Sequence, residues 1–371
     1  MKRFKTIDTA RGLAIFGMVV GHMLNWWLTE EDLWIYLVYY IILAPLGVSA
    51  FLFISGASTT LAYRKRLMLL KESDEFNMQT VRNVFMLRAL ILLGIALIYN
   101  IVGALLIFKD LTWIWAWNVL QTIAFSLFII WPLLRTSKIL RIILGIILLI
   151  ANQLIFELLL PYQGEINFYG IIFYILFNPT HEYVILPFFS MFLLGTVLGE
   201  FLFELDQIEN QDERRVAFKN NHIYLLILGV ILIIFGILFQ FPSFLEHAMF
   251  SSMVYSLGLI LIIYSLLMFI EELEIIKIKE SHKFFYYYSY YSFTIYIAHN
   301  LLYFLFLRQL TIITIWIPII VTMIILTLLI RFVHKKLGPY ASIKFGISVI
   351  SFVLIVRKKD KIKLILANNK L

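Results

Sequence analysis

Ten segments of the chain are apolar over a length sufficient to cross a lipid bilayer, and this feature constrains the fold more than any other. Of the 371 residues, 62% are apolar and 15% are charged, whereas a soluble domain is roughly 45–50% apolar and about 25% charged. A soluble core cannot bury that much apolar surface, so soluble enzymes and nucleic-acid-binding proteins are excluded. The predicted fold is all-α, a polytopic transmembrane helical bundle of about 10 spans. These predicted spans are 12–28, 35–62, 84–107, 112–133, 139–160, 184–202, 223–241, 248–270, 284–307 and 312–333.

The basic residues are divided unequally between the two sides of the predicted bundle. The N-terminal segment and every second loop together hold 21 Lys and Arg residues, and the other loops hold two, Lys109 and Arg308. Cytoplasmic segments of membrane proteins carry such an excess, so the N-terminus is predicted to be cytoplasmic. The net charge of +8 then needs no nucleic-acid partner.

Two apolar segments are too short to count as spans. Residues 166–177 are predicted to lie at the outer interface. Residues 345–356 are predicted to be interfacial as well, because a crossing there would place a basic tail outside; an eleventh span is the alternative. We therefore divide the chain into a transmembrane domain, residues 1–340, and a short apolar or amphipathic segment with a basic cytoplasmic tail, residues 341–371.

The first predicted helix carries ionisable residues at membrane depth, where each costs at least a few kcal/mol and is a functional candidate by default. Arg11 and His22 are eleven residues apart, which places them about 20° apart around a helix. Asp8 and Asn25 extend this stripe at its two ends. Alternatively, Arg11 reaches the lipid headgroups and His22 is a hydrogen-bonded interhelical histidine.

The second predicted helix reads APLGVSAFLFISGAS over residues 44–58. Pro45 can bend it, and Gly47 and Gly56 allow close helix packing. Ser55 offers a hydroxyl group to the interior. Packing is the simpler role for each of these small residues taken singly.

The ninth predicted helix reads YYSYYSFTIYIAHN over residues 287–300. Polar side chains recur at spacings of three and four, which predicts one polar stripe that faces the bundle interior rather than lipid. His299 is either a second proton-transfer group or a structural hydrogen-bonding residue. The stripe consists of Ser289, Ser292, Tyr296, His299 and Tyr303, with Asn300 beside it.

The other polar residues are weaker candidates. No metal site is predicted, because the histidines are dispersed and the chain has no cysteine. Glu200 and Glu204 are expected to face the cytoplasm at the end of their helix. The remaining candidates are Asn118 and Gln121 near the start of the fourth span, and His181 and Glu182 before the sixth.

Several motifs together resemble a known family. They are TIDTARGLAIFGMVVGH (6–22), PLGVSAFLFISGAS (45–58), WNVLQTIAFSL (117–127), ILPFFSMFLLGTVLGE (185–200) and SFTIYIAHN (292–300). In order and spacing they are similar to the multi-span membrane acyltransferases that include the catalytic domain of heparan-α-glucosaminide N-acetyltransferase and its prokaryotic relatives, related to acyltransferase family three. One position departs from this pattern. The animal acetyltransferase has an active-site histidine in the loop after its first helix, and residues 23–34 contain none.

The resemblance implies an enzyme that transfers an acetyl or other acyl group from cytoplasmic acyl-CoA to an amine or hydroxyl group of a sugar, glycan or glycolipid. It implies that Arg11 engages the donor and that His22 is the catalytic histidine. Arginine pairs with phosphates in a fixed geometry, and a buried neutral imidazole suits a general base. We expect His22 and His299 in the catalytic role. The expected donor contacts are Arg11, Asp8, Arg64 and Arg66, and the expected acceptor contacts are Asn25, Ser55, Tyr296 and Asn300.

Two other interpretations stay open at this point. A permease or flippase for a glycolipid or sugar would use the same polar stripes as a substrate path, but it would not depend on acyl-CoA. A purely structural bundle would leave the aligned Arg11 and His22 unexplained. The partners expected are the lipid bilayer and a small-molecule or glycan acceptor, with oligomeric state open. The absence of any lumenal domain or disulfide fits the plasma membrane of a prokaryote best.

Overall fold

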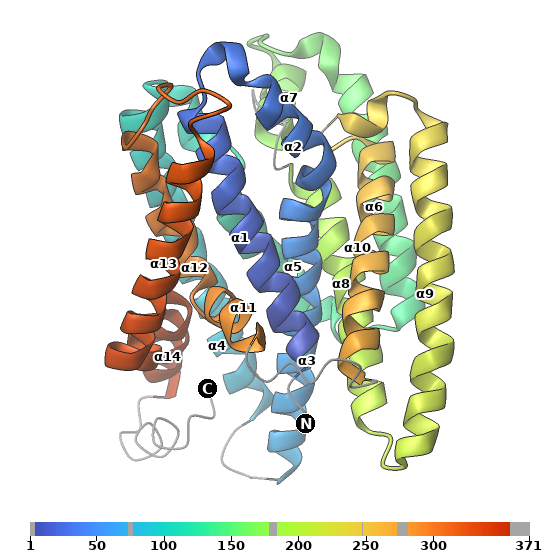
Figure 1. Ribbon diagram of the computed structural model, residues 1–371. Helices are drawn as coiled ribbons and strands as arrows, with labels where there is room; N and C mark the ends of the chain where they lie inside the picture. Colours follow the sequence, from blue (N-terminus) through green and yellow to red (C-terminus); the bar gives the residue numbers. More distant parts are fainter. Residues whose placement is uncertain (1–3, 73–76, 178–183, 247, 273–280, 357–371) are drawn as a thin grey trace. The chain divides into compact units, whose positions relative to one another are not determined.

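The structure is a computed structural model that describes residues 4–72, 77–177, 184–246, 248–272 and 281–356. The chain forms two compact units, each described here by itself (Figure 1). We call Lys2–Phe51 together with Ile262–Val349 the terminal unit, and Leu52–Leu261 together with Ile350–Lys370 the central unit.

All regular elements of the described residues are helical, as the sequence predicts. The helices of the terminal unit are α1 Lys5–Trp27, α2 Trp34–Ala44, α11 Ser281–Tyr290, α12 Ser292–Ala298 and α13 Trp316–Leu337. The helices of the central unit are α4 Met78–Gly103, α5 Val119–Leu133, α6 Lys138–Leu159, α7 Phe168–Phe177, α8 Ile185–Asp206 and α9 Gln211–Phe239. Three helices run from one unit into the other: α3 Ala50–Glu72, α10 Phe250–Glu272 and α14 Ile343–Val356.

Side-chain caps fix the starts of several helices in the central unit. Asn77, Asn118, Ser137 and Asn210 precede α4, α5, α6 and α9, and each accepts a hydrogen bond from a backbone N–H of the first turn. These N–H groups have no partner within the helix, so a cap removes an unsatisfied donor at the membrane boundary. The polar residues between the apolar segments therefore set where those helices begin.

Eight helices of the described residues are long and apolar enough to cross a membrane. They correspond to all the predicted spans except the second and the ninth, which the structure breaks into shorter elements. The two segments predicted to be too short to span form helices of 10 residues, α7, and 14 residues, α14, and their interfacial position stays a prediction.

The second predicted span bends at Pro45, as expected. A π-helical turn, Pro45–Ser49, separates α2 from α3. Proline lacks the backbone N–H that the helix needs, and its ring displaces the preceding turn. The wider π-turn accommodates the resulting gap in the hydrogen-bond ladder.

The ninth predicted span is not one helix, so the prediction of a continuous rod over 284–307 is wrong. Tyr291, with φ −96° and ψ 16°, interrupts it between α11 and α12, and a 3₁₀ segment, His299–Phe304, follows α12 (Figure 1). The turn after α13 hydrogen-bonds across the break. The Ser342 hydroxyl donates to the Tyr290 carbonyl at 3.3 Å, and the Tyr291 hydroxyl donates to the Gly338 carbonyl at 2.6 Å. Broken helices of this kind occur in membranes where protein rather than lipid surrounds the backbone.

The core of the terminal unit lies between α1, α11, α12 and α13. Gly12 brings α1 against the α11 backbone, since a Cβ at this position would lie 2.3 Å from the Phe285 carbonyl oxygen. Further along α1, the Tyr39 hydroxyl donates to the Gly17 carbonyl at 2.5 Å. Buried apolar side chains fill the space along the helix, among them Ile15, Val19, Met23, Tyr288, Ile295 and Ile319.

A loop after the 3₁₀ segment ties down the C-terminal end of α1. The backbone N–H groups of Arg308 and Leu310 donate to the carbonyls of Trp26 and Trp27 at 2.9 and 2.8 Å. The Arg308 guanidinium donates to the Asn25 carbonyl at 2.5 Å. A cation at a helix C-terminus satisfies the last carbonyls and is favoured by the helix dipole. This contact explains the basic residue on the predicted outer side.

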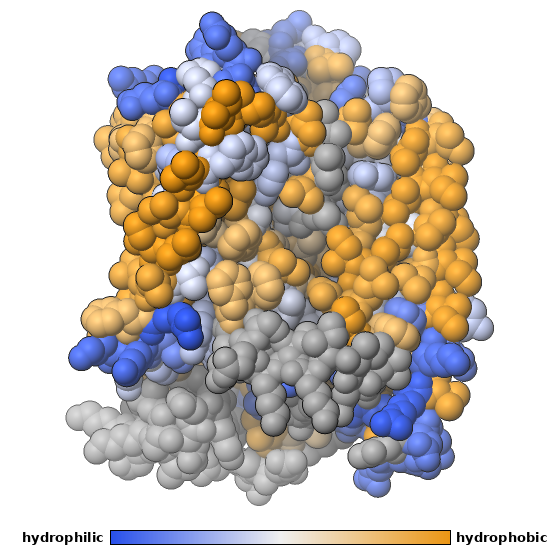
Figure 2. All heavy atoms as spheres, viewed as in Figure 1, coloured by the Kyte–Doolittle hydropathy of each residue, from blue (hydrophilic) through white to orange (hydrophobic). Residues whose placement is uncertain are grey.

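The outer faces of the long helices are apolar. Helix α9 begins with charged and polar residues, and its later turns expose large apolar side chains such as Ile227, Ile231 and Leu238. Figure 2 shows the same change along α9, from hydrophilic at one end to hydrophobic over the rest of its length. Such a surface is suited to lipid contact, so the chain is an integral membrane protein.

Candidate active site

Two histidines and a tryptophan form a cluster inside the terminal unit. His22 and Trp26 lie one turn apart on α1, with ring centroids 4.8 Å apart in a stacked arrangement. His299, at the start of the 3₁₀ segment, lies 4.9 Å from His22 and 5.6 Å from Trp26. The structure thus brings together the two histidines that the sequence proposes, although 277 residues separate them along the chain.

One nitrogen of His299 is positioned to accept a proton. The Nδ1 atom lies 3.2 Å from the Ile295 carbonyl, which can only accept a hydrogen bond, so in the neutral ring Nδ1 carries the hydrogen. The Nε2 atom then has a free lone pair. It is buried, and it has no hydrogen-bond partner among the described residues. A buried acceptor without a partner is costly, which makes this nitrogen a candidate for contact with a substrate or water.

The other end of the α1 stripe meets α11. The Arg11 Nη1 group donates to the Ser289 hydroxyl at 3.3 Å, and that hydroxyl donates to the Asp8 Oδ1 atom at 3.0 Å. All three side chains are buried. Arg11 therefore does not extend to the lipid headgroups; it links the polar stripe of α1 to the first residue of the α11–α12 stripe.

A carboxylate at the end of α10 fixes the start of α1. The Thr6 backbone N–H and hydroxyl donate to Glu271 Oε2 at 2.6 and 2.5 Å, and the Lys5 N–H donates to Glu271 Oε1 at 2.9 Å. A carboxylate at a helix N-terminus satisfies unpaired donors and is favoured by the helix dipole. With the Arg308 contact at its other end, α1 is held at both ends, which fixes the position of His22.

The proposed acceptor contacts divide between the two units. Tyr296 lies 5.8 Å from His299 between ring centroids, and the Asn300 amide donates to the Tyr296 carbonyl at 3.2 Å. Asn25 lies one turn beyond His22 on α1 and is partly exposed. Ser55 lies on the part of α3 that belongs to the central unit, where its carbonyl accepts the Thr59 hydroxyl at 2.8 Å.

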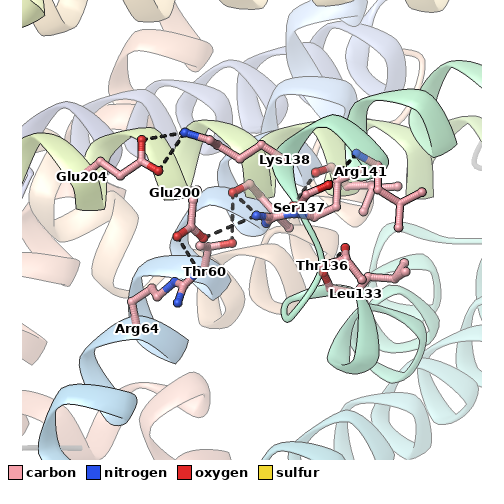
Figure 3. A network of polar contacts seen from close by, with 12 residues as sticks. Thr60, Arg64, Leu133, Thr136, Ser137, Lys138, Arg141, Glu200 and Glu204 are labelled. Atoms are coloured by element: carbon pink, nitrogen blue, oxygen red, sulfur yellow. Dashed lines mark hydrogen bonds and ion pairs between the residues drawn. The ribbon is translucent and has the colours of Figure 1, made fainter.

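One of the two basic donor candidates on α3 meets a buried carboxylate of α8. Arg64 forms an ion pair with Glu200 at 2.5 Å (Figure 3). Glu200 is buried, so the prediction that it faces the cytoplasm is wrong; Glu204, one turn later, is exposed as predicted. Arg66 is partly buried and lies within electrostatic range of Arg88 on α4.

The weaker candidates have a structural explanation where the structure describes them. Asn118 caps α5 by accepting from the Gln121 N–H at 2.8 Å, and the Asn100 amide donates to the Gln121 side chain at 3.2 Å. His181 and Glu182 lie outside the described residues. Within the described part of the chain, no group of three His, Cys, Asp or Glu side chains is placed to hold a metal ion.

Sequence reasoning missed two site residues. The sequence analysis does not single out Trp26, whose indole stacks against both histidines and meets Tyr303 edge-on at 5.6 Å. The spacing of four from His22 was the available signal. Arg141 is not named there either; its side chain is 1% exposed and pairs with Glu200. Only the fold reveals that pairing.

Comparison with known families gives this geometry a context. The sequence pattern of the family described as heparan-alpha-glucosaminide N-acetyltransferase, catalytic, matches residues 3–241, which is more than half of the chain. The chain belongs to this family. A search of curated proteins gives no match. Membership in the heparan-alpha-glucosaminide N-acetyltransferase family places the chain among membrane acetyltransferases and confirms the resemblance on which the sequence interpretation rests.

The family match covers only part of the cluster. Arg11, His22 and Trp26 lie within the matched residues, as do Arg64 and Glu200. His299 and the rest of the α11–α12 stripe lie after residue 241, where the match ends. The match therefore does not bear on the second histidine.

Proposed function

We propose that the chain transfers an acetyl or other acyl group from cytoplasmic acyl-CoA to an amine or hydroxyl group of a sugar, glycan or glycolipid acceptor. The observation that carries this proposal is the close His22–His299 pair, in which His299 is buried and its Nε2 atom has a lone pair and no partner among the described residues. Family membership supplies the reaction class, because the family is one of N-acetyltransferases.

In the proposed reaction, an imidazole nitrogen of the pair removes the proton from the acceptor N–H or O–H group. The acceptor atom forms a bond to the thioester carbonyl carbon, the carbon–sulfur bond breaks, and the sulfur of CoA takes up the proton. His22 is the proposed general base, and His299 is a second proton-transfer group with its tautomer fixed by Ile295. An alternative route acylates His22 first and then transfers the group to the acceptor.

The donor contacts follow from where the polar residues lie. Arg11 and Asp8 are buried and joined through Ser289, so we assign them to the amide-containing pantetheine arm rather than to the phosphates. Arg64 and Arg66 on α3 remain the proposed phosphate contacts, because guanidinium groups bind phosphate oxygens in a bidentate geometry. The proposed acceptor contacts are Asn25, Tyr296, Asn300 and Ser55.

The direct test of this function is donor binding by the purified full-length protein. We expect acetyl-CoA to raise the thermal unfolding temperature saturably. The stabilisation should be about 2.7 kcal/mol at a hundredfold excess of ligand over its dissociation constant. In parallel, a thiol reagent should detect free CoA when a sugar amine or alcohol is added. If acetyl-CoA, longer acyl-CoA and free CoA all leave the unfolding temperature unchanged, the permease interpretation replaces this one.

Trp26 provides a separate test of the cluster. Alanine at this position should lower kcat for acyl transfer at least tenfold with little change in KM for acetyl-CoA, because both imidazole rings lose the surface that orients them. Phenylalanine should restore most of the activity, since it keeps an aromatic face. Steady-state kinetics of the two variants measures the split between kcat and KM.

The neighbouring residue Trp27 is the matched control. Its indole N–H donates to the Leu302 carbonyl at 2.8 Å, and its ring packs away from the histidines against Phe306. Trp27→Phe should lower the unfolding temperature and leave kcat close to the native value. Equal kcat in Trp26→Ala and native protein would show that the indole does not position the histidines.

A further inference from the structure

Three side chains from three helices of the central unit form a buried ionic cluster. Glu200 of α8 receives Arg64 of α3 on its Oε1 atom at 2.5 Å and Arg141 of α6 on its Oε2 atom at 3.4 Å. Figure 3 shows both guanidinium groups directed at this one carboxylate. Sequence analysis assigned no role to Arg141 and a solvent-facing position to Glu200.

The cluster contains more positive than negative charge. Two guanidinium groups share one carboxylate, and the nearby Glu204 is already occupied, since both of its oxygens lie 2.7 Å from the Lys138 ammonium group. The Nε atoms of Arg64 and Arg141 are buried without hydrogen-bond partners among the described residues. Uncompensated buried charge is costly, so this surplus favours the binding of an anion.

The two arginines differ in how firmly they are held. The Arg141 side chain is 1% exposed, and its Nη1 group also donates to the Thr196 hydroxyl and carbonyl at 3.0 and 3.3 Å. The Arg64 side chain is 30% exposed. Its guanidinium also lies over the Phe203 ring, 5.8 Å from the ring centroid. Arg64 can therefore exchange partners while Arg141 keeps Glu200 neutralised.

Further positive charge lies on the same stretch of α3. Arg66 is two residues from Arg64, and it is repelled electrostatically by Arg88 of α4. Neither Arg66 nor Arg88 forms an ion pair with a described carboxylate. The C-terminal half of α3, the start of α6 and the end of α8, which carry the cluster, lie on the side that the excess of basic residues predicts to be cytoplasmic.

We propose that Arg64 is an exchangeable phosphate ligand, which pairs with Glu200 when the donor is absent and binds a phosphate group of acyl-CoA when it is present. Arg141 is the positioning residue, because it keeps Glu200 paired during the exchange. This inference rests on the proposed function and names the subsite for the phosphate end of the donor. The same chemistry would recognise the phosphate of a lipid headgroup, so the test separates the two sources.

The experiment measures acetyl-CoA binding to purified full-length protein by isothermal titration calorimetry in nanodiscs of phosphatidylcholine. Arg64→Gln should weaken binding about ten- to hundredfold, the loss expected for one charge-assisted phosphate contact. Arg64→Lys keeps the charge but loses the planar, two-pronged geometry of the guanidinium group, so its affinity for acetyl-CoA should lie between those of native protein and Arg64→Gln. Arg215→Gln removes the same charge from an exposed site on α9 and should bind like the native protein.

The lipid source is tested by replacing half of the phosphatidylcholine with phosphatidylglycerol. If the affinity of native protein for acetyl-CoA does not change with this lipid, the result supports acyl-CoA as the source of the phosphate that Arg64 binds. A loss of affinity that occurs in native protein and disappears in Arg64→Gln overturns it in favour of a lipid headgroup. Equal affinity of native protein, Arg64→Gln and Arg64→Lys also overturns the inference while leaving the proposed function intact. If native protein binds no form of CoA, the proposed function fails, and this inference fails with it.

Discussion

Alanine at His22 is expected to abolish acyl transfer, and alanine at His299 is expected to lower kcat by about 10²–10⁴-fold, the usual contribution of a positioned general acid or base. Neither change should alter acetyl-CoA binding much, because the proposed phosphate contacts lie on α3. Activity falls because each substitution removes one imidazole from a pair whose rings lie 4.9 Å apart. Turnover assays and calorimetry on the same preparations separate the two effects.

A chemical rescue distinguishes proton transfer from a structural role of His299. Added imidazole should restore part of the activity of His299→Gly, since it can occupy the vacated space and accept a proton. His222→Ala is the control: this histidine is buried on α9 and stacks on Phe218. It should cost stability and leave kcat unchanged. Full activity of His22→Ala would contradict the proposed mechanism.

Leucine at Gly195 is expected to prevent the central unit from folding. A Cβ on Gly195 would lie 1.9 Å from the Phe53 carbonyl oxygen, and one on Gly56 would lie 1.9 Å from the Phe192 carbonyl oxygen. Helices α3 and α8 therefore touch backbone to backbone, as small residues allow in membranes. The obstacle is main chain, which cannot move aside as a flexible side chain does. The loss in free energy of unfolding should therefore exceed the roughly 1–3 kcal/mol that is typical of overpacking.

The yield of monodisperse protein after detergent extraction measures this effect. Gly94→Leu is the matched control, because Gly94 lies on the exposed face of α4 and a Cβ there meets no atom within 4 Å. This control should be extracted and purified like the native protein. Normal yield and unfolding temperature for Gly195→Leu would show that the two helices are further apart than the structure indicates.

Much of the fold can be predicted from the sequence, because the length and hydropathy of a segment identify it as a membrane helix. The bend at Pro45 is also predictable, since proline removes a backbone donor. The break at Tyr291 is not. It depends on partners from the turn after α13, such as Ser342, and no local pattern in residues 284–307 reports a partner 52 residues away.

The candidate site also has a part that the sequence predicts and a part that it does not. The stripe on α1 predicts that Arg11 and His22 share a face, and the structure buries Arg11 against Ser289 of the other predicted stripe. Helical spacing within each segment is visible in the sequence, and so is the need to hide polar groups from lipid. The ionic cluster at Glu200 was missed because its three members come from three separate helices, and each alone resembles an ordinary residue near a membrane surface.

The attachment of α1 at both its ends has a consequence for how the protein is made. Its partners come late in the chain: Glu271 binds the start of the helix across 265 residues, and Arg308 binds its end across 283. His22 therefore meets His299, its partner from another segment, only after 277 further residues have been added. A nascent chain that stops at residue 241 would contain the whole family match and yet lack every α1 contact described here with α10, α11 and the Arg308 loop. Assembly of the histidine pair thus follows the synthesis of α11 and α12.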